Sequence, residues 1–261
     1  WLDLASTAKA NGILFASSIW EQKYFDLLDD YTCIYKVGSG DLSNHELMKL
    51  FLDAKKPLVL STAMSSLDQI ERTYNFILDY DENAVKDSRL AILQCTAMYD
   101  DPNAKHVNLL AMHKLKHTFD CLIGFSNHAV GINAVVASIA LGASVVEFHF
   151  TDTKNAEFRD HKLSFDASDL ANIISFNNEF QSTLGQPLKT IDPSEKNNVT
   201  EFRRGVFFRK PISAGTLVDI DDLILLRTVV GISAWDLDQI IGKQTNRDIL
   251  PLEALNMDYF S

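Results

Sequence analysis

Residues 33–61 read CIYKVGSGDLSNHELMKLFLDAKKPLVLS, and this stretch decides the fold. It begins and ends with short apolar runs, Cys33–Gly38 and Pro57–Ser61, which are typical of parallel strands covered on both faces. Between the two runs, Ser43-x-x-Glu46 matches the capping box that opens many helices. The predicted helix carries one apolar stripe, formed by Leu47, Leu50, Phe51 and Ala54. The stretch therefore predicts one strand–helix–strand unit.

The same pattern recurs through the first 185 residues. Ser66-x-x-Gln69 and Asp166-x-x-Asp169 are predicted to open two more helices, and the apolar segment 133–141 is predicted to form another. Strands that alternate with helices at about 20–33 residues favour a (β/α) barrel or a doubly wound sheet. A closed eight-stranded barrel needs two units more than the six found here. The predicted strands are Ile13–Ser17, Cys33–Gly38, Pro57–Ser61, Leu90–Cys95, Leu122–Phe125 and Val145–Phe150.

The character of the sequence changes after Gly185. Residues 186–202 contain two prolines and the pair Asn197-Asn198, and we interpret them as a linker. In residues 203–261, short β-like runs such as Gly205–Phe208 and Leu223–Leu226 are separated by turns. The predicted organisation is therefore an α/β domain over residues 1–185, a linker over 186–202 and a small β-rich domain over 203–261.

The composition restricts the possible partners. The 261 residues are 46% hydrophobic and 23% charged, which is typical of a globular protein. A formal net charge of −11 argues against nucleic acid as the main partner, although a local cluster of cations suffices for a small anion. No apolar run approaches the roughly 20 residues of a membrane span, and no secretory signal is visible. Because Cys33, Cys95 and Cys121 are widely spaced, we expect reduced thiols in a cytoplasmic protein.

A candidate anion cradle follows the second predicted strand. Functional residues of parallel α/β folds lie at the C-terminal ends of the strands, and this strand ends in Lys36-Val-Gly-Ser39-Gly-Asp41. Burying an unpaired lysine is costly unless it faces a site, and glycines let backbone N–H groups approach an anion. We interpret the segment as a phosphate or carboxylate cradle. The alternative is a structural turn from which Lys36 reaches water.

Two histidines lie at the ends of the last two predicted strands. His128 follows the fifth strand and His149 ends the sixth, so adjacent strands would bring both imidazoles to one mouth. There they could bind a divalent metal and leave positions open for water and substrate. The alternative is a pair of hydrogen-bonded core histidines. Other strand ends add polar groups that suit a polyhydroxylated, anionic small molecule: Ser17-Ser18, Ser61-Thr62, Thr96 with Tyr99, and Asp160-His161-Lys162.

These motifs, in this order, resemble the sialic acid synthase family over essentially the whole chain. The matching segments before the tail are Lys36–Asp41, Pro57–Met64, Cys95–Tyr99, Ser126–His128, Glu147–Thr151, Asp160–Lys162 and, in the linker, Pro193–Lys196. The tail, with Ile212, Gly215, Leu223, Arg227, Ile240–Lys243 and Arg247–Ile249, resembles the antifreeze-like (SAF) domain of that family. The implied fold is a TIM (β/α)8-type barrel that lacks its first two or so βα units in this chain, followed by a SAF domain.

The resemblance implies an activity and a role for each matching residue. The family condenses phosphoenolpyruvate with an open-chain N-acylated amino sugar and releases phosphate, giving sialic acid or a related nonulosonic acid. It uses Mn²⁺ or Mg²⁺ and forms domain-swapped homodimers. By position, the expected metal ligands are His128 and His149, and Lys36, Ser39, Ser126 and Ser18 are expected to hold phosphoenolpyruvate. Tyr99 and Asp160 are expected to face the sugar, Arg227 to reach it from the partner chain, and Asp41 to handle a proton.

This sequence also departs from the family pattern. Ala97 replaces an Asn or Ser, Asn127 replaces an Asp, and Phe148 replaces a basic residue. Two alternatives stay open, and these changes motivate the first of them. The first is a degenerate homologue that binds a sugar or a partner without turnover, and the second is a metal-dependent aldolase that uses pyruvate.

Overall fold

The structure is a computed structural model that describes residues 1–158, 160–227 and 230–261. The chain separates into two compact units, Trp1–Gly185 and Gln186–Ser261. Each unit has its own apolar core, and each is described by itself below.

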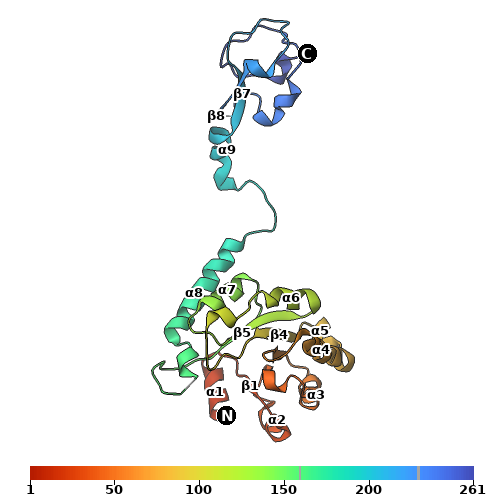
Figure 1. The fold of residues 1–261 in the computed structure, drawn as a ribbon, viewed down its shortest axis with the longest axis vertical. Coiled ribbons are helices and arrows are strands. Elements are labelled where there is room, and N and C mark those ends of the chain that lie inside the picture. The colour runs from red at the N-terminus through yellow and green to blue at the C-terminus, as the bar shows by residue number, and fades with distance from the viewer. Residues whose placement is uncertain (159, 228–229) are drawn as a thin grey trace. The chain divides into compact units, whose positions relative to one another are not determined.

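The first unit is built on one sheet of six parallel strands in the order β1-β2-β3-β4-β5-β6 (Figure 1). A doubly wound sheet reverses its strand order at a switch point. The strictly sequential order of the described strands instead matches barrel-type winding, and the sheet curls as part of a barrel does. The strands are β1 (Ser17–Ser18), β2 (Tyr35–Val37), β3 (Leu58–Ser61), β4 (Leu90–Cys95), β5 (Leu122–Asn127) and β6 (Val146–Phe148).

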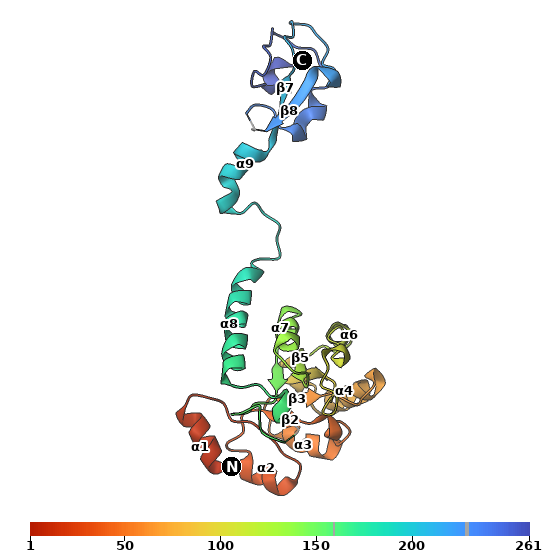
Figure 2. The same ribbon diagram turned by 60° about the vertical axis from the view of Figure 1, so that its left-hand side comes forward.

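Helices connect the strands, and α3, α4, α6 and α7 lie along the outer side of the sheet (Figure 2). The predicted capping boxes of α4 and α8 are confirmed, with Ser66 and Asp166 as the N-caps. The predicted cap of α3 is wrong by one residue, because Asn44 accepts the hydrogen bond from the Leu47 amide. The helices are α1 (Leu2–Ala10), α2 (Gln22–Leu28), α3 (His45–Asp53), α4 (Leu67–Asp81), α5 (Asn83–Lys86), α6 (Ala111–Thr118), α7 (Asn133–Ala140) and α8 (Ala167–Leu184).

The two faces of the sheet differ in composition. Outward-facing side chains belong to a large apolar cluster that the helices cover, and Tyr35, Leu60, Ile92 and Phe125 are fully or nearly fully buried in it. On the inner face, a smaller separate cluster contains Val59, Ala91 and Leu93, with Ile34 and Val145 packed against it. Above this apolar layer, toward the C-terminal ends of the strands, the inner positions become polar.

The first predicted strand is placed too early. The structure forms β1 at Ser17–Ser18, whereas Ile13 and Leu14 precede it and are exposed. The apolar run that indicated a strand at 13–17 therefore mostly lies outside the sheet. Within the described part of the chain, no helix has both the length and the apolarity needed to cross a bilayer.

The second unit is small and rich in β structure. It contains the antiparallel pair β7 (Arg204–Phe208) and β8 (Leu223–Arg227), and isolated bridges such as Ile212 with Ile249. Its buried apolar residues include Val206, Phe208 and Ile240. The segment that the sequence predicts as a linker is partly helical, since α9 (Lys196–Phe202) lies within it.

Candidate active site

A polar layer lies on the inner face of the sheet, directly above the apolar one. Side chains two residues apart in a strand point to the same face. Each polar residue of the layer therefore follows an inward-facing residue at a spacing of two. The register pairs Cys95 with Ser126 and Ser126 with Glu147, whereas Lys36 pairs with Val59 and Ser61 with Leu93. The layer consists of Lys36 (after Ile34), Ser61 (after Val59), Cys95 (after Leu93), Ser126 (after Gly124) and Glu147 (after Val145).

Lys36 and Glu147 form an ion pair across this layer. The Lys36 Nζ lies 3.4 Å from the Glu147 Oε2, and the Ser126 hydroxyl donates a 2.8 Å hydrogen bond to the Glu147 Oε1. Lys36 also donates to the Val37 carbonyl oxygen at 2.9 Å. The Lys36 side chain is only 16% exposed, and the nearby carboxylate offsets part of the cost of keeping its charge away from water. Lys36 thus faces the site, as the sequence indicates.

Two more serines lie at the C-terminal ends of neighbouring strands. The Ser39 hydroxyl oxygen, just after β2, accepts a 2.9 Å hydrogen bond from the Ala63 amide. Ser61, the last residue of β3, is 3% exposed, and its Oγ has no hydrogen-bond partner among the described residues. A buried hydroxyl without a partner costs about 1–3 kcal/mol. An oxygen atom of a ligand could accept the hydrogen bond that the Ser61 hydroxyl is able to donate. A Cβ at Gly38 or Gly40 would meet open space, which leaves room for an anion beside Ser39.

The two predicted metal-binding histidines lie next to each other. The ring centroids of His128 and His149 are 5.1 Å apart, and the Tyr99 ring lies 5.1 Å and 5.9 Å from them. The His128 Nε2 is 3.2 Å from the Tyr99 hydroxyl, and its Nδ1 is 3.6 Å from the Cys95 Sγ. Burial, together with the neighbouring His149, lowers the pKa of His128. A lowered pKa favours the neutral imidazole, which is the form that binds metals.

These residues fit a metal bound by two protein ligands. Among the described residues, no group of three or more His, Cys, Asp or Glu side chains is arranged to hold an ion. His128 and His149 supply two imidazole nitrogen donors to a divalent ion, and the remaining positions would be left to water and substrate oxygens. The donor set is therefore compatible with an open, catalytic type of site and not with a closed, structural one.

The remaining predicted residues are placed less closely. Ser18 of β1 is the Cα partner of Lys36, and it is exposed. Asp41 is half-buried at the end of the short helix Ser39–Asp41. Asp160 lies in the loop between β6 and α8. Arg227 belongs to the second unit, where its guanidinium lies over the Phe202 ring at 5.9 Å.

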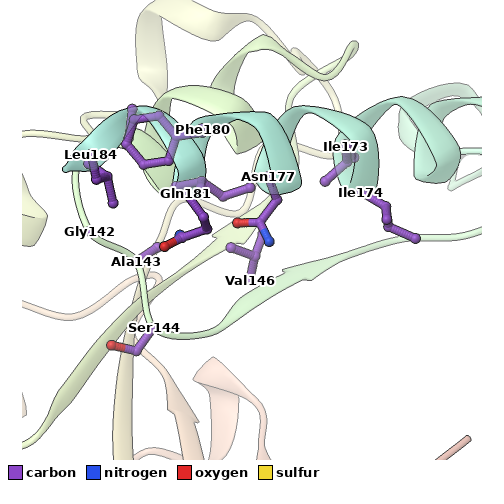
Figure 3. Close-up of a pocket in the computed structure, with 12 residues that line it drawn as sticks. Gly142, Ala143, Ser144, Val146, Ile173, Ile174, Asn177, Phe180, Gln181 and Leu184 are labelled. Carbon is purple, nitrogen blue, oxygen red and sulfur yellow. The ribbon is translucent and has the colours of Figure 1, made fainter. Parts of the chain in front are cut away.

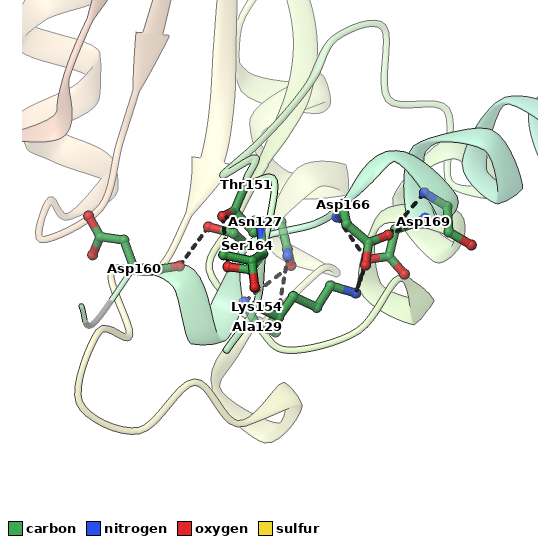
Figure 4. A network of polar contacts seen from close by, with 10 residues as sticks. Asn127, Ala129, Thr151, Lys154, Asp160, Ser164, Asp166 and Asp169 are labelled. Carbon is green, nitrogen blue, oxygen red and sulfur yellow. Dashed lines mark hydrogen bonds and ion pairs between the residues drawn. The ribbon is translucent and has the colours of Figure 1, made fainter. Parts of the chain in front are cut away.

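Polar contacts hold the loop that carries Asp160 (Figure 4). The Ser164 hydroxyl donates to the main-chain oxygen of Asp160 at 2.6 Å, and Thr151 contacts His161 Nδ1 at 2.7 Å. Lys154 pairs with both Asp166 and Asp169 at the start of α8. This loop is therefore tied at its middle and at its end.

The sequence analysis named Ser61 only among the polar groups at strand ends, and it gave no site role to Cys95 or Glu147. The signal that could have found them is the period of two along each strand: Glu147 precedes His149 by two residues, and Cys95 follows Leu93 by two. Cys95 is free, as Cys33 and Cys121 are, and burial raises the pKa of its thiol.

A cavity of about 410 Å³ lies elsewhere, between α7, β6 and α8 (Figure 3). Its lining is largely apolar and includes Ile139, Val146, Ile173 and Phe180. None of the predicted site residues lines it, so it is separate from the polar layer.

The fold and the site together define a barrel-type α/β protein with a paired lysine and two adjacent imidazoles at the C-terminal ends of its strands. The chain belongs to the NeuB family, whose model matches residues 2–189. A SAF domain matches residues 203–258. The predicted resemblance is confirmed by both matches.

Similar proteins include several acid synthases. An N,N'-diacetyllegionaminic acid synthase of Campylobacter jejuni is 33% identical over 92% of this chain and 71% of its own length. A pseudaminic acid synthase of the same species is 28% identical over 97% of this chain and 72% of its own. The human N-acetylneuraminate-9-phosphate synthase is 29% identical over 93% of this chain and 66% of its own.

Solved structures agree with the fold. An N-acetylneuraminic acid synthetase from Leptospira borgpetersenii, in complex with citrate, aligns with a TM-score of 0.68 and 25% identity. The alignment covers 76% of this chain and 67% of that one. A spore coat polysaccharide biosynthesis protein E from Chromobacterium violaceum has a TM-score of 0.79 over 99% of this chain and 77% of its own, and at 21% identity it supports the fold alone.

Proposed function

We propose that this protein is a transferase that condenses phosphoenolpyruvate with an open-chain N-acylated amino sugar to form a nonulosonic acid. The single observation that carries the proposal is the cluster of Lys36, Glu147 and Ser126, which contact one another beside two adjacent imidazoles. Family membership and the names of the relatives support the same reaction class.

In the proposed reaction, C3 of phosphoenolpyruvate bonds to the aldehyde carbon of the sugar. Water then adds to C2, and phosphate leaves from the same carbon. Lys36 and the hydroxyls of Ser39, Ser61 and Ser126 would hold the phosphate and carboxylate groups, because ammonium and hydroxyl donors form strong hydrogen bonds to anions. Ser18 lies beside Lys36 in the register and would complete this pocket.

Tyr99 and Asp160 would contact the sugar, and Asp41 would handle a proton near the reacting carbons. Holding both substrates in one site replaces a bimolecular encounter, which contributes up to about 7–11 kcal/mol to lowering a barrier. His128 and His149 would hold Mn²⁺ or Mg²⁺, which supplies Lewis-acid polarisation of the sugar aldehyde when bound.

Three further features belong to the same proposal. We propose a domain-swapped homodimer, in which Arg227 of one chain would reach the sugar bound by the other. We also propose a cytoplasmic location. We also propose that the six described strands form part of an eight-stranded barrel to which about two more βα units belong.

The test is a phosphate-release assay. The full chain is incubated with phosphoenolpyruvate, Mn²⁺ and a panel of acceptors that includes N-acetylmannosamine and diacetamido sugars. We expect phosphate release that requires both an acceptor and phosphoenolpyruvate. Turnover with pyruvate in place of phosphoenolpyruvate would contradict the proposal, as would silence with every acceptor.

A further inference from the structure

Glu147 occupies the donors that the proposed function gives to the substrate. Its Oε1 accepts the hydrogen bond from the Ser126 hydroxyl at 2.8 Å, and its Oε2 lies 3.4 Å from the Lys36 Nζ. One protein carboxylate therefore contacts the ammonium and a hydroxyl that would bind the phosphate or carboxylate of phosphoenolpyruvate.

In the absence of substrate, the Glu147 carboxylate stabilises the largely buried charge of Lys36. Lys36 is largely buried, and an unpaired ammonium in that position would cost several kcal/mol. Glu147 is held in place because Ser126 is its Cα partner on the neighbouring strand, at the same level of the inner face. A carboxylate at this position neutralises the site before any anion arrives.

The Glu147 side chain can also move away from these donors and into water. The Glu147 side chain is 39% exposed, whereas its neighbours Val146 and Phe148 pack outward against the apolar core. Rotation of the side chain into water thus leaves the core packing of β6 intact. An incoming anion can then take over both donors.

We propose that Glu147 is a resident counter-anion, which phosphoenolpyruvate displaces on binding and which competes with phosphate for Lys36 and Ser126 after the reaction. This inference rests on the proposed function. Displacing Glu147 costs the same free energy for every anion that uses these two donors. It therefore raises the Kd of phosphoenolpyruvate and the Kd of phosphate by the same factor. The benefit is faster release of phosphate, since the returning carboxylate replaces it on the same donors.

The test is Glu147→Gln in the full chain. This change keeps the size of the side chain and an oxygen acceptor for Ser126, but it removes the charge that opposes an anion. Titration calorimetry measures the Kd of phosphoenolpyruvate and, separately, of inorganic phosphate. Because partly exposed ion pairs contribute modestly, we expect both Kd values to fall by about three- to tenfold.

The matched control is Glu82→Gln, which removes the same charge from an exposed pair with Lys86. Both Kd values should stay unchanged in this variant. Circular dichroism checks the fold, and Glu147→Ala gives a second measurement if the glutamine variant folds poorly.

The outcomes separate the two proposals. If the wild type binds phosphoenolpyruvate and Glu147→Gln binds it no more tightly, Glu147 is not a counter-anion, and the proposed function is unaffected. If Glu147→Gln binds phosphoenolpyruvate more tightly but binds inorganic phosphate no more tightly, the two anions do not displace Glu147 at the same cost, and that part of the inference is wrong. If neither the wild type nor any variant binds phosphoenolpyruvate, the proposed function fails and the inference fails with it.

Discussion

Ser61→Ala is predicted to stabilise the ligand-free protein and to weaken phosphoenolpyruvate binding. Ser61 is 3% exposed, and its buried Oγ lacks a hydrogen-bond partner among the described residues. In water the same hydroxyl is fully solvated, so folding leaves it with an uncompensated cost of about 1–3 kcal/mol. Alanine removes that cost and leaves almost no cavity. The two expected effects therefore have opposite directions.

The magnitudes follow from the burial and from the proposed contact. A gain of about 1 kcal/mol raises the unfolding temperature of a domain of this size by roughly 2–4 °C. A hydrogen bond to a charged group contributes about 1.5–3 kcal/mol. Its loss should raise the Kd of phosphoenolpyruvate by about 10- to 150-fold.

The assay combines scanning calorimetry of the ligand-free protein with titration of phosphoenolpyruvate. Thr32→Val is the matched control, because the Thr32 hydroxyl is also buried without a described partner but precedes β2, at the N-terminal end of the sheet. Both variants should unfold at higher temperature, and only Ser61→Ala should lose affinity. A lower unfolding temperature for Ser61→Ala, or an affinity equal to that of the control, would refute the reasoning.

Three other predictions concern the site and the sheet. His128→Ala and His149→Ala should each reduce Mn²⁺ binding at least about tenfold, with unchanged circular dichroism, and unchanged affinity in both would show that the imidazoles are not ligands. Burial lowers the pKa of His128, so below about pH 6.5 the unfolded chain binds a proton that the folded chain does not. The free energy of unfolding should therefore decrease as the pH is lowered, by at most about 1.4 kcal/mol per pH unit from this group. Urea unfolding of wild type and His128→Asn at pH 7.5 and pH 5.5 should show a smaller decrease in the variant. Gly124→Ala should destabilise the first unit by about 1–3 kcal/mol or more, because the added Cβ would lie 2.2 Å from the Val145 carbonyl oxygen; a denaturant midpoint equal to that of wild type would contradict this.

Local patterns predicted the regular elements well. Capping boxes at Ser66 and Asp166 are present because their hydrogen bonds are formed by residues three apart in the chain. The pattern at Ser43 failed because the adjacent Asn44 also carries a capping side chain, and local spacing does not choose between the two. The strand predicted at 13–17 failed for another reason, since pairing with β2 selects Ser17–Ser18.

By itself, the sequence determined the family, the alternation of strands and helices, and the identity of the polar residues at the strand ends, because these are properties of neighbouring residues and of motif order. Only the tertiary structure decided that Glu147 pairs with Lys36, that the Ser61 hydroxyl is left without a described partner, and that Cys95 lies against His128. Those contacts join strands 33–111 residues apart along the chain (from Cys95 to His128, and from Lys36 to Glu147), and they depend on sheet register and on the packing of whole side chains. Periodicity tells which face a residue occupies, but the neighbours on that face are set by the strands that pair beside it.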